Sequence, residues 1–396
     1  MFLKSNTLAF TVTSLLCFLL TNSWASNPLQ TFESLDSSSL LVVDTNHHIL
    51  HSKNADEPLI PASTVKILTA LIALEHWGED HRFSTDFYFD SSLNYLWIKG
   101  YGDPYLISEE LDLIVDKLKE AGITEFDGIG VDTSYFDRSI KIDGQGKSLN
   151  PYDASVGALA SNFNTINIRV YEDSISSSEE QTPLTPIAEE LSQGLGIGTH
   201  RINLGDAELG PRYFSELLKS KLNRKGILAE VNYMSGSIPT SAKLLFTYKN
   251  SHTLEQIISS MLEFSNNFIA NQLYFLLGAE LIGAPASLWK SQTIVTDYVK
   301  QNFEWENYEI VEGAGLSTKN RLSAHQLVDL LNRFKAYRHL LPAQNSHILA
   351  KSGTLKNVST YAGYLNRGSQ WLSFALMINQ RVNFTFREKL AIELLK

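Results

Sequence analysis

The residues whose types and spacing could do chemistry begin in the stretch PASTVKILTA, which runs from Pro61 to Ala70. If a helix begins near Ser63, Lys66 follows three residues later and lies on the same face, one turn away. A serine is a weak nucleophile until a neighbour takes its proton, and a desolvated lysine can have its pKa lowered enough to do so. The spacing therefore predicts an activated serine. The alternative is a helix N-terminus that Ser63 caps while Lys66 reaches solvent.

A serine-lysine pair that attacks a carbonyl also needs a second hydroxyl to relay protons and a cation to hold a carboxylate. Such sites carry these groups in three boxes, S-x-x-K, S-x-N and K-[ST]-G. The chain holds boxes that begin at Ser63 and Ser287, at Ser92, Ser148 and Ser265, and at Lys351. Order along the chain favours Ser63 over Ser287, because Ser287 follows the S-x-N box at Ser265. That box lies in an expected turn between helices, and Lys351 lies in an expected strand.

The elements that must position these boxes are expected to alternate along the chain. Residues 39–54 read as a hairpin that leads into a helix over 61–77, and residues 347–379 read as strands followed by a last helix. Strands between helices at both ends, with different material in the middle, predict a discontinuous α+β domain that hosts an insertion. The expected boundaries are 26–80 with 245–396 for the first domain and 81–244 for the inserted domain.

The start of the chain has the features of an exported protein. Lys4 precedes an apolar run over residues 8–20, and a small-x-small end at Ala25 predicts a signal peptide over residues 1–25. The alternative is a membrane anchor, but the run is short for a hydrocarbon core of about 30 Å. Cys17 is the only cysteine, so the cleaved chain has no disulfide, no cysteine metal site and no thiol nucleophile.

Charge and histidine content exclude several kinds of partner. The net charge of -10 and the absence of any basic run argue against nucleic acid. No later segment is long and apolar enough for a stable membrane span. His47 and His48 form the one histidine pair and are expected in a solvated hairpin turn, and the other histidines show no metal-ligand spacing. No cofactor and no metal are therefore expected.

The chain resembles the class C low-molecular-mass penicillin-binding proteins, the D-alanyl-D-alanine carboxypeptidase/endopeptidase (peptidase S13-like) family, over nearly all of its cleaved length. Beyond the three boxes, the resemblance runs through seven stretches in the order of the family. These are LWIKGYGDPYL, GIGVDTSYF, VGALASNFNTI, GPRYFSELLKSKLNRKGI, SNNFIANQL, VEGAGLSTKNRLSAHQL and AKSGTLKNVSTYAGYL. The implied fold is a penicillin-binding-protein/β-lactamase-like transpeptidase domain, an antiparallel sheet flanked by helices, with an inserted smaller α/β domain.

The resemblance implies a role for each box. Ser63 would form an acyl-enzyme with the penultimate D-alanine of a peptidoglycan stem peptide, and Lys66 would be the base that activates it. Ser265 would relay a proton to the leaving amine, and Asn267 would bond the amide of the substrate. Lys351 would add positive charge beside Ser265, which also disfavours a proton on Lys66.

The remaining substrate contacts also come from the resemblance. Ser352 and Thr354 would offer hydroxyls to the carboxylate of the substrate, and the oxyanion would lie between the backbone N–H groups of Ser63 and Thr354. The strand that starts near Ala350 would pair with the extended peptide. Asp132 is a candidate for the polar end of a diamino-acid side chain; the alternative is a turn residue after a strand.

Three positions depart from the pattern of the family. Asn266 stands where the family usually has aspartate, and Ser352 replaces a threonine while keeping the hydroxyl. Thr318 stands after Gly-Leu-Ser where many members carry arginine, with Lys319 and Arg321 close by. These departures affect recognition of the substrate side chain and leave the acylation machinery intact.

The resulting hypothesis is a periplasmic serine-type DD-peptidase that acts on peptidoglycan peptides and is acylated by β-lactam antibiotics as covalent inhibitors. The first alternative is a β-lactamase, which needs a base for fast deacylation, and the sequence assigns none. The second is a peptidoglycan-binding scaffold protein of weak activity, which the change at Asn266 motivates. The balance between carboxypeptidase and endopeptidase activity stays open, because both share one acyl-enzyme.

Overall fold

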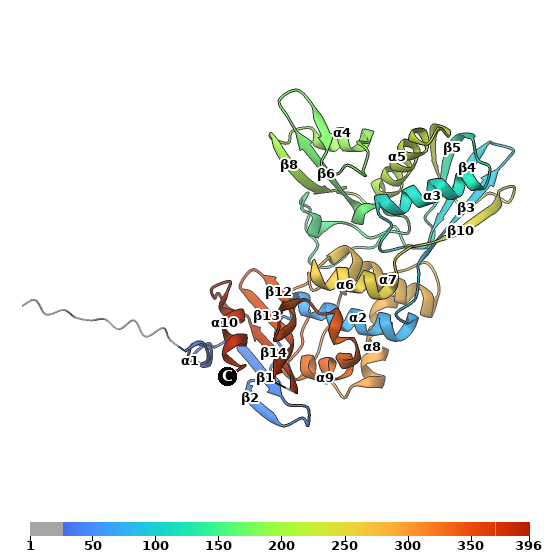
Figure 1. The fold of residues 1–396 in the computed structure, drawn as a ribbon. Coiled ribbons are helices and arrows are strands. Elements are labelled where there is room, and N and C mark those ends of the chain that lie inside the picture. Colours follow the sequence, from blue (N-terminus) through green and yellow to red (C-terminus); the bar gives the residue numbers. More distant parts are fainter. Residues whose placement is uncertain (1–26, 369) are drawn as a thin grey trace, which may run out of the picture.

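The computed structural model describes residues 27–368 and 370–396. The expected signal peptide, residues 1–25, lies outside the described residues. Figure 1 shows two parts: a lower one, in which the first and last strands of the chain lie together, and an upper one made from the middle of the sequence. No described helix is both long and apolar enough to cross a membrane.

The lower part is built on a six-stranded antiparallel sheet with the strand order β11-β12-β13-β14-β1-β2. Its strands are β1 (Ser38–Val43), β2 (Ile49–Lys53), β11 (Ala343–Asn345), β12 (Ile348–Leu355), β13 (Val358–Arg367) and β14 (Gln370–Ile378). The pairing of β1 with β2 confirms the expected hairpin. Since β1 pairs with β14, strands from the two ends of the chain lie next to each other in one sheet.

Helices cover both faces of this sheet, because its strands are apolar on both sides. Alternate residues of β1 point to opposite faces: Leu41 and Val43 join one core, and Leu40 and Val42 join the other. The first core is shared with α2 (Lys66–Trp77), α6 (Leu254–Glu263), α7 (Asn267–Ile282), α8 (Leu288–Asn302) and α9 (Ala324–Phe334). The second is shared with α1 (Pro28–Glu33) and α10 (Phe386–Glu393). This layering confirms the expected α+β class.

Short 3₁₀ turns and caps fix where these helices begin. The turn η1 (Ala62–Val65) precedes α2, and η4 (Lys335–Leu340) follows α9. Thr253 and Gln256 form a capping box at the start of α6, so both ends of that turn are satisfied. The central helix α7 is apolar almost all round and buried over its first 13 residues after the cap, except at Asn267 itself.

The upper part holds two further sheets. A five-stranded mixed sheet has the order β10-β3-β4-β5-β9, and a three-stranded antiparallel sheet has the order β7-β6-β8. Their strands are β3 (Ser84–Asp90), β4 (Tyr95–Gly100), β5 (Glu125–Asp132), β6 (Thr165–Val170), β7 (Ile175–Ser177), β8 (Gly198–Asn203), β9 (Leu228–Ser235) and β10 (Lys243–Lys249). The accompanying helices are α3 (Ser108–Glu120), α4 (Pro186–Ser192) and α5 (Leu209–Arg224), with η2 (Pro151–Asp153) and η3 (Asn162–Asn164). Strands β3 to β6 and β8 to β10 share a separate core with α3, α4 and α5.

The chain leaves the lower part after α2 and returns to it at α6. The returning segment first forms β10, which pairs with β3 and so belongs to the five-stranded sheet. The boundary expected at residue 245 falls inside this strand. We therefore propose that the inserted domain runs from about residue 81 to Lys249, because a strand that completes a sheet belongs with that sheet.

Candidate active site

Ser63 lies in the turn η1, directly before α2, so Lys66 begins the helix one turn later. The hydroxyl of Ser63 does not cap the helix, which has no side-chain cap at this end. Instead, the Nζ of Lys66 lies 3.1 Å from the Oγ of Ser63. The expected i, i+3 contact between the two side chains is therefore present in the structure.

Lys66 is completely buried. Its Nζ donates to the Oδ1 of Asn267 at 2.7 Å and to the carbonyl oxygen of Ala314 at 2.5 Å. Burial holds the pKa of Lys66 well below its usual range, the positive charge of Lys351 lowers it further, and Glu312 opposes both effects. A lysine with a lowered pKa in contact with a serine hydroxyl can act as a base toward it.

The S-x-N box lies in the turn between α6 and α7. Ser265 has a positive φ of 52°, and its side chain has no hydrogen-bond partner among residues 27–368 and 370–396. Asn266 caps α7 by accepting from the N–H of Ile269 at 3.1 Å. Asparagine and aspartate cap helices about equally well, which gives the departure at this position a local structural reason. Asn267 begins α7 and reaches Lys66.

Lys351 lies on β12 and is 2% exposed. Its Nζ donates to the carbonyl oxygen of Ser352 at 2.9 Å. Burial lowers the pKa of Lys351 to about 8, with a further decrease from Arg387 and an opposing increase from Glu263. The charge of Lys351 also acts on Lys66, as the sequence predicts.

Two glycines bring other segments against the amide of Ser63. A Cβ on Gly353 of β12 would lie 2.8 Å from the backbone nitrogen of Ser63 and 2.9 Å from the oxygen of Pro61. A Cβ on Gly315, which has a φ of +83°, would lie 2.8 Å from the same nitrogen. Any other residue at either position would push these segments away, so both glycines are needed for the close approach.

The hydroxyl groups of Ser352 and Thr354, which follow Lys351, have different surroundings. Ser352 is partly buried. The Oγ1 of Thr354 accepts from the Nη1 of Arg387 on α10 at 2.7 Å, and the same nitrogen donates to the oxygen of Gly353 at 3.0 Å. The side chain of Thr354 is thus already bonded to Arg387, whereas its backbone follows directly on the glycine that touches Ser63.

Sequence reasoning missed Glu312, a fully buried carboxylate behind the site. It accepts hydrogen bonds from four successive backbone N–H groups, those of residues 314–317, at 2.7 to 3.2 Å. It also accepts from the side-chain amides of Asn271 and Asn320. These bonds fold the loop that presents the Ala314 carbonyl to Lys66. The available signal was an acidic residue directly before the Gly-Ala-Gly of a quoted stretch.

The structure does not bring Asp132 into contact with these groups. Its carboxylate accepts from the backbone N–H of Ser134 at 2.9 Å and of Ile238 at 3.3 Å, within the inserted part. These bonds hold the pKa of Asp132 below its usual value, against the effect of burial. Such bonds are typical of a turn residue after a strand, which was the alternative interpretation.

The positions that follow Gly-Leu-Ser also bond within the protein. Lys319 pairs with Asp143 at 2.7 Å, and Asp143 accepts from the hydroxyl of Ser317 at 2.5 Å. Arg321 donates to the carbonyl oxygen of Thr318 at 2.5 Å. These cations hold the loop that Glu312 folds, and the described contacts place none of them on Ser63.

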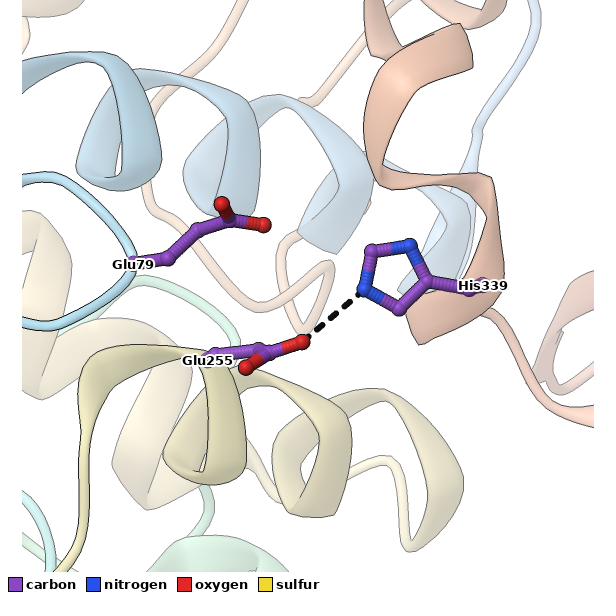
Figure 2. A group of neighbouring side chains, drawn as sticks. All are labelled: Glu79, Glu255 and His339. Atoms are coloured by element: carbon purple, nitrogen blue, oxygen red, sulfur yellow. Dashed lines mark hydrogen bonds and ion pairs between the residues drawn. The ribbon is translucent and has the colours of Figure 1, made fainter.

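One group of side chains could hold a metal ion. Figure 2 shows Glu79, Glu255 and His339, whose nearest ligand atoms all lie within 4.8 Å of one another. His339 pairs with Glu255 at 3.0 Å, and both side chains are about half exposed. The three residues are distant in sequence, so their spacing gave no signal. This group makes no described contact with Ser63 or Lys66.

Comparisons with known proteins show likenesses in sequence and in fold. The profile of the D-Ala-D-Ala carboxypeptidase 3 (S13) family matches residues 28–191 and 207–346. The D-alanyl-D-alanine carboxypeptidase of Actinomadura sp. strain R39 is 24% identical over 423 residues, covering 86% of this chain and 77% of that protein.

Solved structures share the fold. Penicillin binding protein 4 of Haemophilus influenzae superposes with a TM-score of 0.74 at 18% identity, over 93% of this chain and 99% of that one. The penicillin G-acylated predatory endopeptidase of Bdellovibrio bacteriovorus gives a TM-score of 0.54 at 16% identity, with 91% of each chain covered. These likenesses confirm the expected fold of an antiparallel sheet flanked by helices with a further α/β part.

Proposed function

The chain belongs to the D-Ala-D-Ala carboxypeptidase 3 (S13) family, and on that basis we propose that it is an exported serine peptidase of peptidoglycan. It cleaves the bond after the penultimate D-alanine of a stem peptide through an acyl-enzyme on Ser63. The leaving group is a terminal D-alanine or the amine of a D-alanyl crosslink. The same serine is acylated by β-lactams.

The observation that carries this proposal is the contact of Ser63 with a completely buried lysine. The Nζ of Lys66 lies 3.1 Å from the Oγ of Ser63, and burial and the charge of Lys351 lower the pKa of Lys66. A buried ammonium group is costly unless an opposite charge pairs with it, so a buried lysine without such a pair points to a function. A binding scaffold needs no such base, so the arrangement favours an enzyme.

In the proposed reaction, the Oγ of Ser63 forms a bond to the carbonyl carbon of the D-alanine while Lys66 takes the hydroxyl proton. The oxyanion forms between the N–H groups of Ser63 and Thr354, and each such donor is typically worth about 3 kcal/mol of barrier. The C–N bond then breaks as Ser265 passes its hydroxyl proton to the leaving nitrogen and takes in return the proton that Lys66 holds. Water completes the cycle by attacking the acyl-enzyme and releasing the shortened peptide.

The edge of β12 is suited to hold the peptide. Its neighbour β11 pairs with only Ile348 and Leu349, and the N–H of Ala350 bonds to Pro342. From Lys351 onward, the outer edge of β12 has no strand partner among the described residues. An extended peptide can add to such an edge as a further strand. Asn267 and Ser352 then lie on either side of the substrate.

Export and acylation by drugs are parts of the same proposal. The features of residues 1–25 support a cleaved signal peptide, and a peptidoglycan substrate supports a periplasmic location. The relative from Bdellovibrio bacteriovorus carries penicillin G as an acyl group, which supports the reaction of Ser63 with β-lactams.

The test is the mass of the intact protein after incubation with benzylpenicillin, for the cleaved wild type and for Ser63→Ala. We expect a lasting gain of one penicillin in the wild type and none in the variant. Consumption of the drug without an adduct would indicate a β-lactamase. If the protein stays unmodified, the drug is not consumed and no D-alanine is released, the result would favour the alternative of a peptidoglycan-binding scaffold protein.

A further inference from the structure

A small cavity lies at the end of the sheet just beyond the proposed oxyanion position. Its volume is about 130 Å³, and it opens between the turn from β12 to β13 and the segment from β14 to α10. The lining includes Thr354, Asn357, Ser359, Gln380, Arg381 and Phe384. No acidic side chain lines it, in a protein whose net charge is -10. The cavity is therefore suited to a negatively charged group.

A buried arginine lies behind the wall of this cavity. Arg387 is 4% exposed and bonds to the oxygens of Gly353 and Thr354. Its Cζ lies 5.0 Å from the ring centre of Phe384, which lines the cavity. Within residues 27–368 and 370–396, Arg387 makes no ion pair, and its buried Nε has no hydrogen-bond partner. The charge of Glu388 acts on Arg387 but forms no ion pair with it. A buried charge without a paired counter-ion is costly, so this site favours a further anion nearby.

Two other polar groups of the cavity are also free. The Oγ of Ser359 is buried and has no hydrogen-bond partner among the described residues. Arg381 is exposed and forms no described ion pair or hydrogen bond. Buried hydroxyls in proteins are normally bonded. The cavity thus has one cation, Arg381, and one unsatisfied hydroxyl in its lining, with the buried Arg387 behind its wall.

The direction of the substrate brings its acyl side to this cavity. Lys351 and Ser352 hold the carboxyl-terminal side in the proposed reaction, and the oxyanion lies at Thr354, so the peptide runs antiparallel to β12. Its amino-terminal residues then pass Thr354 toward Asn357. Three extended residues cover about 10 Å, which brings the residue two before the acyl D-alanine to the cavity.

The opposite end of the site has the opposite charge. A groove of about 540 Å³ follows α6 toward Ser265 and is lined by Glu255, Glu263 and Phe264. Its lining ends at Phe264, next to Ser265, which gives the proton to the leaving group in the proposed reaction. A substrate with negative charge on its acyl side is therefore attracted at one end of the site and repelled at the other.

We propose that the cavity is a carboxylate-binding subsite, in which Arg381 binds a carboxylate that the stem peptide carries before its acyl D-alanine, while the buried Arg387 adds positive charge behind the wall. The inference rests on the proposed function and names the substrate class more closely. A γ-linked D-glutamate supplies such a group, because its α-carboxylate stays free. Peptides in which this group is a carboxamide lose the interaction.

The test compares two peptides, acetyl-γ-D-glutamyl-L-lysyl-D-alanyl-D-alanine and its counterpart with a carboxamide in place of the glutamyl α-carboxylate. D-alanine release gives kcat/KM for each, in the wild type, in Arg381→Gln and in the control Arg224→Gln, whose exposed arginine lies on α5. We expect the wild type and the control to prefer the carboxylate peptide about tenfold, as one charge-assisted hydrogen bond allows. In Arg381→Gln the ratio falls to about one, and in the wild type added salt reduces it.

Equal rates on the two peptides in the wild type would overturn the subsite, and so would an Arg381→Gln enzyme that keeps the preference. If the same protein still releases D-alanine and gains the mass of benzylpenicillin, only the subsite is lost. If it does neither, the proposed function fails together with the subsite.

Discussion

The two S-x-x-K pairs of this chain share their spacing and differ in almost everything else. Lys66 is buried and its Nζ contacts Ser63, Asn267 and Ala314. Lys290 instead donates to the carbonyl oxygens of Gly283 and Pro285, at 2.5 and 2.7 Å. The first lysine is held beside its serine, and the second stabilises the end of α7.

The surroundings explain this difference. Gly315 and Gly353, from two distant segments, lie close to the backbone nitrogen of Ser63. The loop held by Glu312 brings the carbonyl oxygen of Ala314 to Lys66. Ser287 only precedes α8, and its buried Oγ has no hydrogen-bond partner among the described residues. A serine and a lysine one turn apart become an active pair only when other segments desolvate the lysine and approach the serine.

The largest expected effect separates the two serines. Ser63→Ala removes the nucleophile, and we expect D-alanine release to fall by at least about a thousandfold. Ser287→Ala removes a hydroxyl without a partner, so activity stays unchanged and stability changes by less than about 0.5 kcal/mol. D-alanine release and thermal unfolding of both variants measure this. Equal losses in the two variants would end the distinction.

The lysines come next. Lys66→Met removes the base, and we expect a loss of several hundredfold, within the range of about 10²–10⁴ for general base catalysis. Lys290→Met removes two hydrogen bonds at the end of α7, which destabilises the protein by about 1 kcal/mol and leaves the rate of acylation intact. Rates of benzylpenicillin acylation and unfolding in urea test the pair. A Lys66→Met protein that acylates normally would contradict the assignment of the base.

The pH dependence sharpens the comparison through Lys351. Its pKa is lowered from 10.5 in the unfolded chain to about 8 in the folded one. The folded state therefore loses this proton first, and stability rises as pH increases from 8 toward 10.5, by on the order of 3 kcal/mol in total. We expect Lys351→Met to reduce this rise, leaving the part that comes from the lowered pKa of Lys66, and Lys290→Met to keep it in full. Urea unfolding of the three proteins between pH 7 and pH 10 decides.

The smallest expected effect concerns Asn267, which contacts Lys66 of the active pair. Asn267→Ala removes the oxygen that accepts from Lys66, and we expect acylation to slow about tenfold, as loss of one hydrogen bond to a charged group allows. Gln292, which donates to Val311 beside the second pair, offers a control: Gln292→Ala should acylate at the wild-type rate. Stopped-flow acylation with a coloured β-lactam measures both. An unchanged rate of acylation in Asn267→Ala would show that Ser63 and Lys66 work without this hydrogen bond.

Much of this site could be predicted because its groups are encoded by short spacings. One helical turn places Lys66 on Ser63, and the unique Lys351-Ser352-Gly353 box fixes the strand. The hairpin over 39–54 followed from alternating apolar residues around a polar turn. The signals were local, and so the corresponding elements could be expected from the sequence.

The remaining features depend on contacts between distant segments. Glu312 acts on Lys66 through the backbone of a loop that its carboxylate holds in place. The spacing of residues in the sequence does not predict such bonds. The resemblance makes Asp132 a candidate for substrate contact, and the structure shows its carboxylate bonded to the backbone of Ser134 and of the distant Ile238. The group at Glu79, Glu255 and His339 arises from three segments that meet only in the folded chain.

The pairing of β1 with β14 has a consequence for the order in which the protein is made. Ser38 pairs with Ile378, and these residues lie more than 300 positions apart. The inserted sheets and their helices lie between them in sequence, share a core of their own and are synthesised before β14. The nascent chain therefore contains its serine long before the segment that completes the site, and it stays inert until its final strands join the first.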